Sequence, residues 1–219
     1  MALDAASYPA LWSLFDQGGP RPEYVLPVLW SESNFNSSVI NSIGCAGVNQ
    51  ACSALLSSLG VTAQQYATWP ASEQIQKAVT PYMLANAPLN SGTRVYQANF
   101  LPATLKTQKA LSSILAASPG AVYEANAGFD TGHTGVIRIQ DLANAIARAA
   151  AQPAVQQAIT AAYALRPGWF PKDPVYGTDY TPMWQTVAIA SGILLGAGCI
   201  AYYIAEGELP TPSRLAHSL

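Results

Sequence analysis

The stretch that decides the fold is EYVLPVLWSESNFNSSVINSIGCAGVNQ, residues 23–50. Its first half predicts a helix, because the 3, 1, 3 spacing of one helical face joins four of its side chains: Val25, Val28, Leu29 and Glu32. A proline at position 22 suits the first turn of that helix. We therefore expect Glu32 at the end of a helix, on the face that points inward.

Glu32 is the one charged side chain between Ser31 and Gln50. An acid on an apolar helix face is costly to ionise, so burial raises its pKa and it keeps its proton near neutral pH. A general acid for glycosidic cleavage needs that property. The alternative is an ordinary glutamate at a helix end, bonded to nearby amides.

Most of the chain predicts further helices. Residues 1–165 contain several helical segments separated by turns rich in glycine, proline and serine, and strand signals are almost absent. One stretch, Asp130 to Asp141, has the outline of a calcium-binding EF-hand loop, but Gly132 and Thr134 stand at two positions where such a loop needs oxygen ligands. We expect a metal-free turn there, no cofactor, and an all-α domain over residues 1–165.

Composition excludes several classes of function. Half of the residues are hydrophobic and only 10% are charged, against about 25% in typical soluble domains. The net charge is −2 and lysine and arginine form no cluster, so nucleic acid is not expected as a partner. The odd, low count of three cysteines argues against a disulfide framework, and Cys45 and Cys52 are interpreted as small buried apolar residues.

The amino-acid composition changes after residue 165. Residues 166–183 are rich in proline and predict an extended linker. Residues 184–205 predict a transmembrane helix, because Thr186 to Ala205 carry no charge and would span about 30 Å. The alternative is a buried, alanine-rich helix of a soluble domain. A stripe of small residues could pair two such helices into a homo-oligomer: Ala188, Gly192 and Gly196. A polar tail, residues 206–219, follows.

Two short motifs resemble one enzyme family. Glu32-Ser33-Asn34-Phe35 followed by Gly47-Val48-Asn49-Gln50 is similar to the Glu-Ser-x-Phe and Gly-Leu-x-Gln motifs of the phage-type lytic transglycosylases. The likeness continues in order and spacing over residues 20–150, about two thirds of the chain. The resemblance implies a fold like that of goose-type lysozyme and soluble lytic transglycosylases.

The resemblance also implies roles for five residues. Glu32 would be the catalytic acid and base, and Ser33 would help to orient it. Gln50 would line the sugar cleft, Tyr96 would contact the catalytic carboxylate, and Asn99 would face the same cleft. This chain departs from the family pattern at Ser37, where a proline is usual, and at Tyr96 to Asn99, which read YQAN instead of YNAG.

A single carboxylate matches the chemistry of that family. Most glycoside hydrolases need two carboxylates that flank the scissile bond. The nearest acids in sequence, Glu23 and Glu73, are expected to point away from Glu32 or to lie on a separate helix. In a lytic transglycosylase the sugar supplies its own nucleophile, so one acid is sufficient.

These observations predict a peptidoglycan-cleaving enzyme carried by a virion, which opens the cell wall during phage genome entry. Its partners would be glycan strands, other virion proteins and a membrane reached through residues 186–205. It would act in the bacterial envelope. The N-terminus lacks the pattern of a secretory signal, and that absence suits delivery by the virion. The alternatives are a structural virion or channel protein with a non-catalytic sugar-binding domain, or a transglycosylase of a bacterial secretion or conjugation machine.

Overall fold

The computed structural model describes residues 2–178. Ten α-helices are found there: α1 (Ser7–Asp16), α2 (Pro22–Ser33), α3 (Ser53–Ser58), α4 (Ala63–Tyr66), α5 (Ala71–Gln74), α6 (Thr80–Ala85), α7 (Gly92–Phe100), α8 (Ala121–Asn126), α9 (Ile139–Ala150) and α10 (Pro153–Ala164). Three short segments join them: the π-helix η1 (Ile75–Val79) and the 3₁₀ turns η2 (Pro102–Thr104) and η3 (Ala127–Phe129). Two strands complete the fold: β1 (Ile114–Ala117) and β2 (Val136–Arg138).

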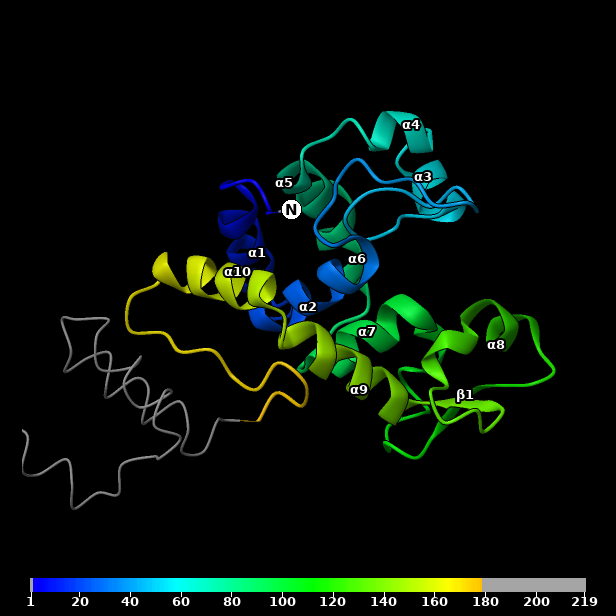
Figure 1. Cartoon of the computed structure of the whole chain (residues 1–219). Coiled ribbons are helices and arrows are strands. Elements are labelled where there is room, and N and C mark those ends of the chain that lie inside the picture. The colour runs from blue at the N-terminus through cyan, green and yellow to red at the C-terminus, as the bar shows by residue number, and fades with distance from the viewer. Residues whose placement is uncertain (1, 179–219) are drawn as a thin grey trace, which may run out of the picture. The chain divides into compact units, whose positions relative to one another are not determined.

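Helix α2 is the centre of this arrangement (Figure 1). It packs against α1, α7, α9 and α10, and all its residues from Pro22 to Leu29 are buried. A helix that is apolar around its whole circumference belongs inside a domain. The sequence predicts a helix that points Val25, Val28 and Leu29 inward, and these three side chains are buried.

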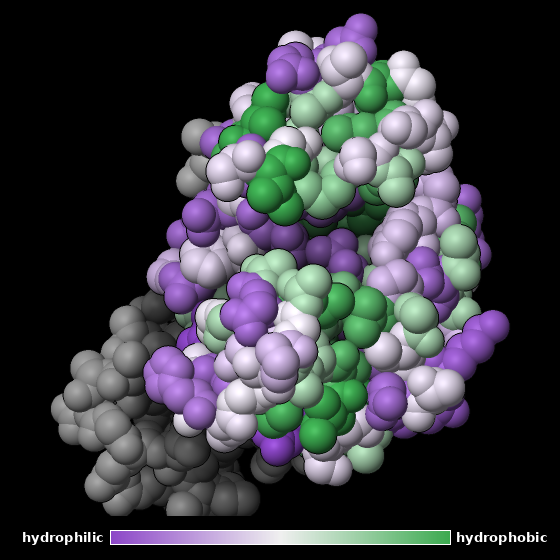
Figure 2. All heavy atoms as spheres, turned by 90° about the vertical axis from the view of Figure 1, so that its right-hand side faces the viewer, coloured by the Kyte–Doolittle hydropathy of each residue, from purple (hydrophilic) through white to green (hydrophobic). Residues whose placement is uncertain are grey.

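Two lobes project from the central helices. The chain between α2 and α5 forms one lobe, which carries α3, α4 and a small hydrophobic cluster of its own around Tyr66 and Leu56. The chain between α7 and α9 forms the other, which carries α8 and the two strands. Figure 2, which views the right-hand side of Figure 1, shows this face hollowed between the upper and the lower lobe.

The predicted fold class is wrong. An all-α, lysozyme-like domain with a transmembrane helix was expected, but the described chain is helical with an antiparallel sheet of β1 and β2. Short strands explain the error: Leu115 and Ala116 are buried next to each other, and the register shifts between Ile114 and Ala116. Four residues with such a bulge give no alternating apolar pattern.

The membrane prediction gains no support. Among residues 2–178, no helix combines the length and the apolar character that crossing a bilayer requires. The predicted span 184–205, the Ala188, Gly192 and Gly196 stripe, and the tail 206–219 lie outside the described residues.

The described part of the proline-rich segment, residues 166–178, packs against the helices. Arg21 donates a hydrogen bond to the carbonyl of Phe170 over 2.7 Å, and the amide of Gly92 donates to Pro174 over 2.8 Å. The ring of Trp169 meets those of Trp12 and Phe15 edge to face. Residues 166–178 are thus part of the same compact unit as the helices, whereas the sequence predicts a linker that starts at residue 166.

Candidate active site at the end of helix α2

Glu32 lies in the last turn of α2, where the chain leaves the core for the upper lobe. The helix ends because Asn34 and Phe35 both adopt left-handed backbone conformations, with φ of 53° and 63°. That conformation is unfavourable for a bulky residue such as phenylalanine, and burial of the Phe35 ring in the core holds it in place. The abrupt turn leaves the Glu32 side chain only partly covered.

Helix α7 supplies the partners of the Glu32 carboxylate. The amide nitrogen of Asn99 donates a hydrogen bond to Glu32 Oε1 over 3.0 Å, and the Tyr96 hydroxyl also interacts with the carboxylate through a hydrogen bond. The Tyr96 hydroxyl lies 3.0 Å from Ser31 Oγ. Asn99 is in the last turn of α7, where the chain enters the lower lobe. The Glu32–Asn99 pair therefore lies where the two lobes diverge.

Burial raises the pKa of Glu32 to about 7, and the hydrogen bonds from Asn99 and Tyr96 lower it by less than burial raises it. The physical cause is desolvation. Burial removes water from the charged carboxylate, and its few hydrogen-bond donors only partly replace that water, so the neutral acid is favoured. The same loss of solvent, with the nearby Glu32 charge as a smaller cause, raises the pKa of Tyr96 well above its usual range. At neutral pH the tyrosine is therefore a neutral hydrogen-bond donor, and about half of Glu32 carries its proton.

Ser33 and Gln50, predicted to orient the acid and to line the cleft, have their hydrogen bonds elsewhere. The buried hydroxyl of Ser33 lies 3.0 Å from the carbonyl of Leu29 and 3.1 Å from that of Val48. The amide nitrogen of Gln50 donates to the carbonyl of Gly47 over 3.0 Å. Ser33 thus fastens the loop of residues 44–51 to α2, and Gln50 shapes that loop. The orientation of Glu32 by Ser33 and the contact of Gln50 with sugar stay predictions.

Gln74, at the end of α5, is a residue that sequence reasoning missed. Its buried side chain accepts a hydrogen bond from the amide of Val48 over 2.7 Å and donates to the carbonyls of Ser37, Tyr66 and Trp69. Gly47 has a φ of 76°, and a Cβ there would collide with Gln74 and Tyr66. The glycine of the Gly-Val-Asn-Gln motif is therefore needed for close packing on Gln74.

The interpretation of Cys45 and Cys52 as unpaired apolar residues is wrong, because they form a disulfide. They lie on either side of the bridge in which Ala46 and Ala51 exchange backbone hydrogen bonds of 3.0 and 2.7 Å. A count of cysteines could not reveal this pairing, because it depends on the hairpin of residues 45–52 bringing two positions seven apart together. The disulfide closes the loop that carries Gly47 and Gln50.

The two nearest carboxylates have other partners. Glu23 is fully buried and accepts hydrogen bonds from Arg21 Nε, the Tyr163 hydroxyl and the amide of Lys172, at 2.6, 2.7 and 2.9 Å. Glu73 forms an ion pair of 2.6 Å with Lys77 one helical turn away. The partners of Glu23 are Arg21, Tyr163 and Lys172, and the ion-pair partner of Glu73 is Lys77. The interactions found for these two acids therefore do not include Glu32.

Asp130 organises a turn. Its two carboxylate oxygens accept hydrogen bonds from the Tyr123 hydroxyl, the amide and hydroxyl of Thr134, and the amide of Gly135. Asp141 accepts from the amide of Arg138 and caps α9. The segment from Asp130 to Asp141 is thus a hydrogen-bonded turn that leads into a helix, and both acids have a structural partner.

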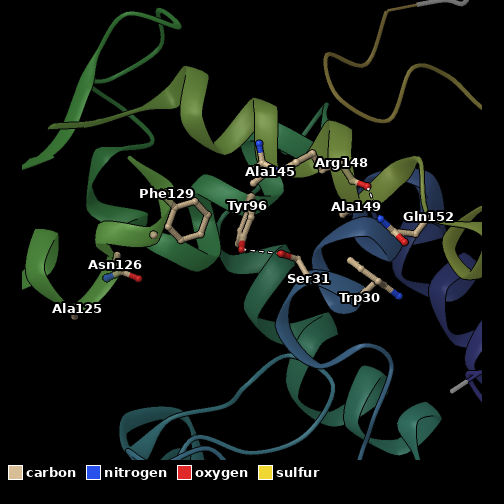
Figure 3. Close-up of a pocket in the computed structure, with 11 residues that line it drawn as sticks. Trp30, Ser31, Tyr96, Ala125, Asn126, Phe129, Ala145, Arg148, Ala149 and Gln152 are labelled. Atoms are coloured by element: carbon tan, nitrogen blue, oxygen red, sulfur yellow. Dashed lines mark hydrogen bonds between the residues drawn. The ribbon is translucent and has the colours of Figure 1, made fainter. Parts of the chain in front are cut away.

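A pocket of about 580 Å³ is lined by Ser31, which precedes Glu32, and by Tyr96 (Figure 3). Ser31, Tyr96 and Phe129 from η3 are among its lining residues, and the rings of Tyr96 and Phe129 meet edge to face. Glu32 is not itself a lining residue. The volume lies within the range of about 300–1,000 Å³ that is typical of ligand sites, so a space large enough for part of a ligand lies against Tyr96, which interacts with Glu32.

Comparison with protein-family models, with curated proteins and with solved structures finds no match to this chain. The assignment to a family therefore stays a prediction from the two motifs around Glu32 and Gln50.

Proposed function

We propose that this protein is a lytic transglycosylase that cuts the glycan strands of peptidoglycan with Glu32 as its one acid and base. The observation that carries the proposal is the position of Glu32, partly open to solvent at the junction of two lobes and held by Asn99 over 3.0 Å. Burial raises the pKa of this carboxyl to about 7. A general acid works best when its pKa is near the working pH.

The reaction would proceed in two steps that use the same carboxyl group. Protonated Glu32 donates its proton to the oxygen between N-acetylmuramic acid and N-acetylglucosamine, and the bond from C1 of the muramic ring to that oxygen breaks. The neighbouring acetamido oxygen stabilises the positive charge at C1. The Glu32 carboxylate then takes the proton of the C6 hydroxyl, whose oxygen bonds to C1 and closes a 1,6-anhydro ring. Glu32 ends the cycle protonated.

The surroundings of Glu32 support this cycle. Asn99 and Tyr96 hold the carboxylate through hydrogen bonds, so the group stays in place when its charge changes. Ser31 holds the Tyr96 hydroxyl in turn. Among residues 2–178, the neighbouring acids Glu23 and Glu73 are engaged in ion pairs of their own. A mechanism in which the sugar supplies the nucleophile needs no second carboxylate.

The Cys45–Cys52 disulfide supports a site of action outside the reducing cytoplasm. Disulfides persist in oxidising compartments such as the bacterial periplasm, and peptidoglycan lies in that compartment. The proposed delivery by a virion during genome entry agrees with this environment.

The test is digestion of purified sacculi, followed by analysis of the released sugars. Products that end in 1,6-anhydro-N-acetylmuramic acid support the proposal, whereas reducing ends would identify a hydrolase. Glu32→Gln should abolish release, and Glu73→Gln is the matched control. Binding of peptidoglycan without any cleavage by the wild-type protein would favour a non-catalytic sugar-binding domain instead.

A further inference from the structure

The pocket beside Glu32 contains one charged side chain, Arg148 of α9. The other lining residues are aromatic, small or amide-bearing: Trp30, Tyr96, Phe129, Asn126 and Gln152. Acidic side chains do not line it. A pocket that combines aromatic walls with one positive charge and no negative charge favours an anionic ligand with an apolar or amide-containing body.

Arg148 differs from the other arginines of the core helices and the docked segment. Arg21 pairs with Glu23, Arg166 pairs with Asp16, and Arg94 donates to the carbonyls of Leu105 and Gln108. Within residues 2–178, no hydrogen bond or ion pair involves the guanidinium of Arg148, and the side chain is exposed. Its five donors are therefore open to a ligand, and a guanidinium binds a carboxylate well through two parallel hydrogen bonds.

The pocket and the proposed catalytic acid share a wall. Ser31 lines the pocket and directly precedes Glu32, while Tyr96 lines the pocket and interacts with the Glu32 carboxylate. Figure 3 shows the Tyr96 ring between Phe129 and Ser31, with Arg148 on the helix beside them. A group bound in the pocket would thus lie against Tyr96, whose hydroxyl interacts with the Glu32 carboxylate.

We propose that this pocket binds the carboxylate carried by the substituent on O3 of N-acetylmuramic acid, with Arg148 as the residue that binds it. The inference rests on the proposed function. The sugar rings of peptidoglycan are uncharged, so its anions belong to that substituent. Two forms of the substituent carry the same chemistry: the peptide stem, with its own carboxylates, and the free lactyl group that is left when the peptide is removed.

The experiment measures kcat/KM of the full chain on two substrates: peptide-bearing glycan strands and strands stripped of peptide. Arg148→Gln removes the charge, Arg148→Lys keeps it, and Lys109→Gln is a matched control at an exposed lysine that does not line the pocket. Binding of an uncharged N-acetylglucosamine oligomer is measured in parallel, because general damage to the cleft would weaken it.

We expect Arg148→Gln to lower kcat/KM about fivefold, as for a partly solvated charged pair, with partial recovery in Arg148→Lys and no change in oligomer binding. A loss confined to peptide-bearing strands identifies the stem, and a loss on stripped strands identifies the lactyl carboxylate. Unchanged kcat/KM on both substrates overturns the pocket proposal while the proposed function stands. Absence of Glu32-dependent cleavage by the wild-type protein is a failure of the proposed function instead.

Discussion

The two glutamates of helix α2 show how the same side chain takes different roles at the two ends of one helix. Glu23 is fully buried and accepts three hydrogen bonds, one of them from Arg21. Glu32 is only partly buried, yet its partners are the neutral side chains of Asn99 and Tyr96. The more buried acid is compensated by a positive charge and the less buried one is not. The two acids therefore differ in the charge of their hydrogen-bond donors as well as in their depth of burial.

The largest expected effect is on turnover by Glu32→Gln. If Glu32 is the acid and base, the variant should lose at least about 10³-fold in the release of anhydro sugars, the scale of general acid–base catalysis. Glu23→Gln should keep measurable turnover wherever it is folded. Equal rates of anhydro-sugar release by the wild type and by Glu32→Gln would show that Glu32 is not the catalytic acid and base.

The next largest effect is on stability by Glu23→Gln. The variant leaves Arg21 with its charge uncompensated in a largely buried site, which costs about 3 kcal/mol in the free energy of unfolding. Urea denaturation should show this loss, whereas Glu73→Gln, which breaks the more exposed pair with Lys77, should change stability by less than about 1 kcal/mol. An equal, small change in both variants would mean that Glu23 is not the structural anchor inferred here.

The pH dependence of stability provides a third comparison. The folded pKa of Glu32, about 7, exceeds the ordinary value of 4.5, so the folded protein binds the proton more tightly than the unfolded chain. The resulting stabilisation is present below pH 4.5 and is lost as the pH rises to 7. Wild type should lose about 2 kcal/mol over that range relative to Glu32→Gln, allowing for partial solvent exposure. If the wild type and Glu32→Gln differ in free energy of unfolding by the same amount at pH 4.5 and at pH 8, the prediction is wrong.

The smallest effects concern the hydrogen bonds that hold the carboxylate. Asn99→Ala removes a donor that lowers the pKa of Glu32, so the alkaline limb of the pH–rate profile should move to higher pH. In addition, kcat should fall roughly tenfold, because one contact that positions the carboxyl is lost. Tyr96→Phe should act in the same direction. A downward shift of the limb would show that these groups do not stabilise the ionised form.

The sequence predicts the central helix and its acid because both depend on local patterns. The spacing of Val25, Val28 and Leu29 defines the buried face of α2, and the turn-forming residues that follow end the helix next to Glu32. The contact of Glu32 with Asn99 joins residues 67 apart. It could be anticipated only through the resemblance, because helical periodicity cannot tell which two helices meet.

The features that were missed depend on contacts between distant segments or on very short elements. The role of Gln74 depends on backbone groups of Ser37, Val48 and Tyr66, which lie in separate segments of the chain and converge on its side-chain amide. The Cys45–Cys52 disulfide depends on a hairpin whose residues show no strand pattern. The packing of residues 166–178 depends on Arg21, Gly92 and Thr93, which the proline content of the segment does not reveal.

The central claim is that the Glu32 carboxyl holds its proton near neutral pH. It is tested most directly by carbon-13 NMR titration of the glutamate side-chain carboxyls, with the Glu32 resonance assigned by its absence in Glu32→Gln. The structure predicts a midpoint at about pH 7. A midpoint near 4.5, the ordinary value for glutamate, would show that the carboxyl is ionised at neutral pH and would contradict its role as the general acid.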